Sequence, residues 1–113
     1  MNAEVKSEMD KIFGSIFKQY RKRAGYIQAE IAEKLDISEK YVSRIETGIG
    51  GISKETLAKY MNILGISPNL IYKDFIKNPQ VKKEIEISEK LSELSTDKLE
   101  IILQIVKMLK DIK

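Results

Sequence analysis

Apolar residues along most of the chain recur at intervals of three and four residues, the spacing that gathers side chains on one face of an α-helix. In the first such stretch, Phe13, Ile16, Phe17 and Tyr20 follow this spacing. The pattern predicts five helices before residue 78, and no segment alternates as a half-buried strand would. These helices cover approximately residues 7–23, 28–35, 39–47, 54–64 and 68–77.

Residues that begin or end helices lie at the limits of these segments. Ser38 and Ser53 can cap helix N-termini through their hydroxyl oxygens. Pro68 suits a first helical position, because its missing N–H would have no helical partner there. Gly25 and Gly48 can take the left-handed conformation in which many helices end. The sequence therefore predicts short helices separated by tight turns.

Asn78-Pro79 marks a boundary, because proline disfavours helix in the residue before it. Beyond this boundary the apolar spacing predicts two more helices, over about residues 80–94 and 96–112. We therefore predict an all-α protein. It has a five-helix domain at residues 7–77 and a two-helix extension at residues 80–113 that serves dimerisation.

The last predicted helix carries two apolar seams side by side, and one partner helix cannot cover both. Because a two-helix extension has little surface of its own, we expect one seam to pack on the preceding helix and the other on a second subunit. The alternative is that both seams pack back onto the five-helix domain. The residues predicted to serve dimerisation are Leu99, Ile102, Ile105, Val106 and Leu109; the second seam adds Ile101, Met108 and Ile112.

Composition excludes several classes of function. The chain has no cysteine and no histidine, so it lacks disulfides, thiolate metal sites and the usual acid-base residue near neutral pH. Pairs of glutamates occur, but on exposed or highly charged stretches. The segment "GIGG" lacks the strand-turn-helix setting of a phosphate-binding loop. We therefore expect no enzyme activity, no metal and no cofactor.

The chain also lacks the apolar run of about 20 residues that a bilayer span requires. Its N-terminal stretch has neither the basic start nor the apolar core of a secretory signal, so we expect a cytoplasmic protein. Positive charge is uneven: residues 1–79 hold 13 Lys and Arg against 10 Asp and Glu, whereas residues 80–113 hold seven of each. The densest basic cluster, "KQYRKR", suits either a phosphate backbone or a solvated helix end.

The second and third predicted helices are joined by a turn of three residues, the arrangement of a helix-turn-helix. Val42 and Ile45 form the inward side of the third helix, which leaves four polar residues on its outer side. Arginine and lysine can donate to guanine, serine can bond either way, and glutamate can accept from cytosine in the major groove of DNA. These four candidate base-reading residues are Glu39, Lys40, Ser43 and Arg44.

Residues 12–72 resemble the Cro/phage-repressor-like (XRE) family of helix-turn-helix regulators. The resemblance is carried by "YRKRAGYIQAEIAEKLDIS", "YVSRIETG" and "TLAKYMNILGIS", in the order and spacing of that family. It implies a five-helix DNA-binding domain, usually of a transcriptional repressor that binds a two-fold operator as a dimer.

The resemblance also implies roles for single residues. Gln28 matches a glutamine that bonds a phosphate oxygen. Ser38 matches a position that faces DNA, as do the four candidate base-reading residues. Tyr41 matches a position from which it either touches DNA or packs on the first helix. Arg21 and Glu46 match a pair that often forms a salt bridge between the first and third helices.

Three positions depart from the family pattern. Ile27 stands where a threonine cap is usual, a loss of about 1 kcal/mol. Asp36 replaces the glycine of the turn, which the fold should tolerate because Asp accepts a left-handed conformation. The loop "GIGGIS" lacks the basic residues that often hold phosphate, which leaves Lys54 and the N–H groups of Gly50 and Gly51.

If one domain binds DNA weakly, a dimer binds more tightly, because the second domain then binds DNA in an intramolecular step. The two-helix extension loosely resembles the multimerising tails of small Gram-positive regulators of the biofilm and sporulation type, whose tails also bind antagonist proteins. The leading hypothesis is thus a DNA-binding repressor. The alternatives are a protein-interaction antagonist that acts through its tail and an antitoxin that represses its own operon.

Overall fold

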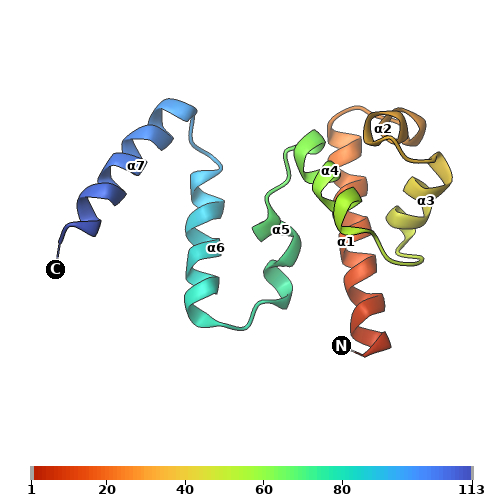
Figure 1. Cartoon of the computed structure of the whole chain (residues 1–113), viewed down its shortest axis with the longest axis horizontal. Helices are drawn as coiled ribbons and strands as arrows, with labels where there is room; N and C mark the ends of the chain where they lie inside the picture. The colour runs from red at the N-terminus through yellow and green to blue at the C-terminus, as the bar shows by residue number, and fades with distance from the viewer. Residues whose placement is uncertain (1, 113) are drawn as a thin grey trace. The chain divides into compact units, whose positions relative to one another are not determined.

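The computed structural model describes residues 2–112, and within this range the chain is all-helical with no strand, as predicted (Figure 1). Two short helices follow the long first helix, and four more complete the chain. A turn of 3-10 helix extends the fifth. The elements are α1 (Ala3–Arg23), α2 (Gln28–Leu35), α3 (Glu39–Thr47), α4 (Lys54–Leu64), α5 (Pro68–Tyr72), η1 (Lys73–Phe75), α6 (Pro79–Leu91) and α7 (Thr96–Lys110).

Helix α1 is longer than the apolar spacing predicts. It begins at Ala3 rather than near residue 7, because the side chain of Asn2 accepts a hydrogen bond of 2.8 Å from the N–H of Val5. Ser38 and Ser53 cap α3 and α4 in the same way, as expected. Helix α6 ends at Leu91, three residues before the predicted limit.

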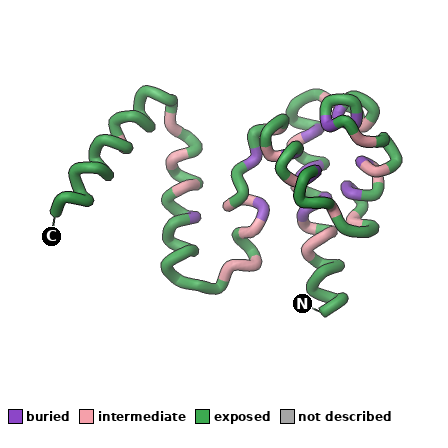
Figure 2. Tube along the Cα trace, in the orientation of Figure 1, coloured by how far each residue is buried: buried purple, intermediate pink, exposed green. Residues whose placement is uncertain are grey.

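Contacts between residues divide the chain into two units, the first ending at Ile71 and the second beginning at Tyr72. Figure 2 shows that most buried residues belong to α1–α5. Rings of Phe17 and Tyr60 stack at the centre of the first unit, 4.3 Å apart. Its buried apolar residues are Phe13, Phe17, Ile31, Ala32, Leu35, Val42, Ile45, Tyr60, Ile66 and Ile71.

Tyr60 is the one buried polar side chain of the described residues whose oxygen lacks a hydrogen-bond partner. Burial raises the pKa of this hydroxyl, and the charge of nearby Glu46 raises it further. The hydroxyl therefore stays protonated, and the ring contributes to stability through its stacking and buried area.

Helices α1 and α3 approach each other backbone to backbone. A Cβ atom at Gly14 would overlap the carbonyl oxygen of Ile45, so only glycine allows this contact. A Cβ atom at Gly48, whose φ is +74°, would lie 2.8 Å from the Cα atom of Lys11. The contact between α1 and the C-terminal end of α3 therefore requires glycine at two positions.

Helix α7 has no buried residue, so the expected burial of one apolar seam against α6 is absent. Leu99 is 37% exposed and Ile112 is 70% exposed. Both seams therefore present apolar side chains at the surface of the chain. None of the helices in the described range is long and apolar enough to cross a membrane.

Candidate nucleic-acid interface

The turn between α2 and α3 begins with a residue in the left-handed conformation. Asp36 has φ +55° and ψ +49°, the conformation predicted for the residue that replaces glycine. The N–H of Ile37 then bonds the carbonyl of Ala32, which ends α2. Ser38 begins α3 two residues later by accepting a hydrogen bond of 3.0 Å from the N–H of Tyr41.

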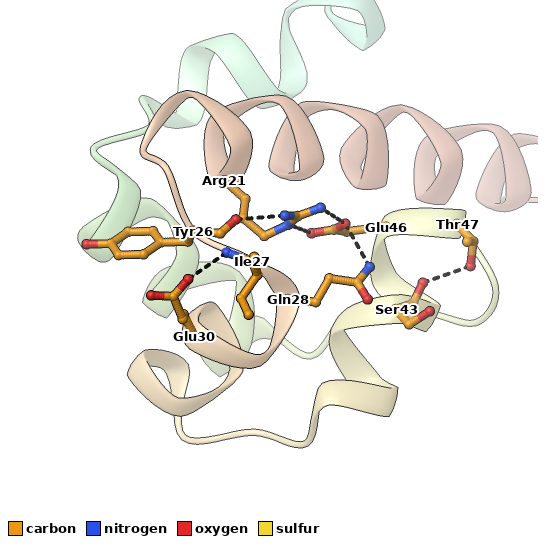
Figure 3. Close-up of polar contacts among 8 residues, drawn as sticks. All are labelled: Arg21, Tyr26, Ile27, Gln28, Glu30, Ser43, Glu46 and Thr47. Carbon is orange, nitrogen blue, oxygen red and sulfur yellow. Dashed lines mark hydrogen bonds and ion pairs between the residues drawn. The ribbon is translucent and has the colours of Figure 1, made fainter.

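The start of α2 lacks the usual side-chain cap, because Ile27 has no polar side chain. Glu30 compensates in part: its carboxylate accepts a hydrogen bond of 3.0 Å from the N–H of Ile27 (Figure 3). This is one half of a capping box. This contact was not predicted from the sequence, although a glutamate three residues after the cap position is its usual signal.

A buried ion pair joins α1 to α3. The guanidinium of Arg21 donates two hydrogen bonds to the carboxylate of Glu46, of 2.6 and 2.9 Å, and a third of 2.7 Å to the carbonyl of Tyr26. The two residues are only 7% and 8% exposed. The hydrogen bond with Glu46 raises the pKa of Arg21, while burial acts in the opposite direction.

Gln28, the first residue of α2, joins the same network. Its side-chain amide donates a hydrogen bond of 3.1 Å to Glu46, so three side chains from three helices point toward one another (Figure 3). The carboxylate of Glu46 is therefore neutralised inside the domain. This arrangement fixes the orientation of α3 relative to α1 and α2.

The outer side of α3 carries the residues that the sequence predicted there. Glu39, Lys40 and Arg44 are exposed and Ser43 is half-buried, whereas Val42 and Ile45 are buried. Among the described residues, none of the three exposed side chains forms an ion pair. Their charges are therefore available to a ligand.

Tyr41 makes a contact that neither sequence-based alternative included. Its hydroxyl oxygen accepts a hydrogen bond of 3.1 Å from the N–H of Ser53, at the start of α4. The loop between α3 and α4 is thereby held beside the N-terminal half of α3. Lys54 follows as the exposed first residue of α4.

The polar residues proposed to face DNA all belong to the first unit, on α2, α3, their caps and the start of α4. The predicted dimerisation residues all lie on α7, in the second unit. No group of acidic residues in the described range could hold a metal ion. A short helix, a tight turn and a second helix with an exposed polar side together define a helix-turn-helix domain.

Comparisons with known proteins agree with this class. A family model described as "Helix-turn-helix" matches residues 17–71. The HTH-type transcriptional regulator ImmR of Bacillus subtilis (strain 168) is 33% identical over an alignment of 87 positions that covers 74% of this chain and 68% of that protein. The chain therefore belongs to the Cro/C1-type (XRE) family of helix-turn-helix transcriptional regulators.

A solved structure extends the likeness beyond the helix-turn-helix domain. A chain of the SinR protein/SinI protein complex is 28% identical, with a TM-score of 0.53. The similarity covers 87% of this chain and 97% of that one. It therefore includes part of the second unit as well as the first.

Replacing Glu46 with alanine should lower the free energy of unfolding by about 3–5 kcal/mol, because Arg21 would stay buried without its partner. Replacing Glu89 removes the exposed pair with Lys73 and should cost less than about 1 kcal/mol. Urea unfolding followed by circular dichroism measures both. Equal small losses would contradict a structural role for the buried pair.

Proposed function

We propose that this protein is a sequence-specific DNA-binding repressor of transcription that acts in the cytoplasm, without enzyme activity or cofactor. It binds a two-fold operator as a dimer through the major groove. The observation that carries this proposal is the exposed polar side of α3, held in place by the buried pair of Arg21 and Glu46. An α-helix fits the major groove and presents such side chains to base edges.

In this proposal four residues of α3 read bases. Lys40 and Arg44 donate to guanine, and Ser43 donates or accepts. Glu39 accepts from cytosine or repels phosphate and so helps to set the register. The residues lie within two turns of the N-terminus of α3, the end that reaches furthest into the groove.

Four more residues contact the DNA backbone, and the donors that they retain suit phosphate. Gln28 gives one amide hydrogen to Glu46 and keeps a second. The oxygens of Ser38 and Tyr41 accept from backbone N–H groups, so each O–H remains free to donate to a phosphate oxygen. Lys54 adds a positive charge at the N-terminus of α4, where helix N–H groups also attract anions.

The second unit, with the two-helix extension at residues 80–113, makes the dimer in this proposal. Exposed apolar side chains along α7 support it, since contiguous apolar surface marks an interaction site. A symmetric dimer would place its two recognition helices on half-sites about one helical turn apart, near 34 Å. Leu99, Ile102, Ile105, Val106 and Leu109 supply the contacts.

A second candidate function uses the same surface. A heterologous protein could pair with α7 and antagonise DNA binding, as an antagonist or in an antitoxin-type pair. The likeness to a chain of the SinR protein/SinI protein complex over nearly its whole length favours this candidate. The dependence of binding on salt concentration distinguishes the two activities, because phosphate contacts release counterions and apolar pairing does not.

Base reading and backbone contact should respond differently to mutation. Arg44→Ala should weaken binding to the operator by about 1–3 kcal/mol and relax the preference at one base pair. Gln28→Ala should weaken binding to all sequences by a similar factor. Binding titrations against an operator and its single-base variants measure both. Identical behaviour of the two variants would contradict the division of roles.

The dimer proposal is tested on two neighbouring residues of α7. Ile105→Asp places a charge in the apolar seam and should raise the dimer dissociation constant by about 100-fold, or about 2.7 kcal/mol. Gln104→Asp adds the same charge next to it, on the polar side, and should change little. Sedimentation across a concentration series measures the dimer fraction. A wild-type mass that stays monomeric at every concentration would overturn the proposal.

A further inference from the structure

The N-terminal part of α1 lies outside the matched family region and yet reaches the loop between α3 and α4. The family model begins at residue 17, whereas α1 begins at Ala3. A Cβ atom placed on Gly51 would lie 3.9 Å from the Cε atom of Lys6. The extra length of α1 thus brings a lysine onto a loop that has no basic residue of its own.

The guanidinium of Arg44 lies close to the neighbouring glycine, Gly50. A Cβ atom on Gly50 would lie 3.3 Å from a terminal nitrogen of Arg44. Within the described residues, neither Lys6 nor Arg44 forms an ion pair, and Asp10, one turn further along α1, forms none with Lys6. The loop therefore has positive charge on two sides, which favours an anion at its surface.

The loop backbone supplies further donors. The N–H of Ile49 bonds the carbonyl of Arg44, and the N–H of Ser53 bonds Tyr41. The N–H groups of Gly50 and Gly51 have no hydrogen-bond partner among the described residues. Unpaired N–H groups beside cations suit a phosphate oxygen, which accepts several hydrogen bonds.

The loop also borders the exposed polar side of α3, which carries the proposed base-reading residues. The hydrogen bond between Tyr41 and Ser53 ties the end of the loop to the N-terminal half of α3. Arg44 belongs both to the exposed side of α3 and to the surroundings of Gly50. A duplex that receives α3 in its major groove would therefore bring backbone phosphates close to this loop.

We propose that Lys6 contacts a DNA phosphate at the Gly50-Gly51 loop, in place of the basic loop residues that the chain lacks. This inference rests on the proposed DNA binding and adds a backbone contact from α1. It assigns Lys6 a positioning role, since phosphate contacts fix the register of a protein on the duplex and carry no sequence information.

The test uses the full chain and a random-sequence duplex of about 20 base pairs, two helical turns. Fluorescence anisotropy gives the binding constant of wild type, Lys6→Gln, Lys6→Arg and Lys59→Gln across a potassium chloride series. Lys59 is exposed on α4 and has no ion pair among the described residues, so its variant removes the same charge elsewhere in the first unit. Circular dichroism confirms that all four proteins are folded.

Lys6→Gln should lower the slope of log K against log salt by about 0.9, the value for one phosphate contact. Lys6→Arg should restore the slope, and Lys59→Gln should leave it unchanged. If wild type binds with a steep slope and Lys6→Gln matches it, this inference is wrong while the proposed function stands. If wild type shows no binding at low salt, both are wrong.

Discussion

The buried ion pair between Arg21 and Glu46 holds α3 in its position against α1. Burying two charges is costly, and here the cost is offset by two hydrogen bonds between the partners and by further bonds to Tyr26 and Gln28. The pair sits where α1 and α3 already approach closely through Gly14. Together these contacts hold α3 in one orientation, with Val42 and Ile45 inward and its charged residues outward.

The same network distinguishes the buried charge of α3 from its exposed charges. Glu46 would repel phosphate if it were exposed, but its charge is matched by Arg21 inside the domain. Lys40 and Arg44 have no such partner among the described residues. Half-buried Gln28 bonds Glu46 with one amide hydrogen and retains a second.

Local patterns in the sequence were enough to predict α2 and α3 to the residue, with Ser38 as cap and Asp36 in the left-handed conformation. Local patterns do not predict contacts between distant residues, and the pair of Arg21 and Glu46 was expected only from the family resemblance. The bond from Ser53 to Tyr41 and the approach of Lys6 to Gly51 depend on how helices pack, which apolar spacing does not specify. The prediction that one seam of α7 is buried against α6 was wrong. Helix α7 has no buried residue, so α6 does not provide the partner surface that a seam requires.

In the proposed function, α3 contacts DNA bases and α7 joins two chains in a dimer. The most direct measurement selects bound duplexes from pools of random and host-genomic DNA, with wild type and with the Lys40→Ala/Arg44→Ala variant, across a salt series. The account predicts a palindromic site that only the wild type enriches. Failure of the wild type to enrich any site at low salt would contradict it, and would point to α7 as the active surface instead.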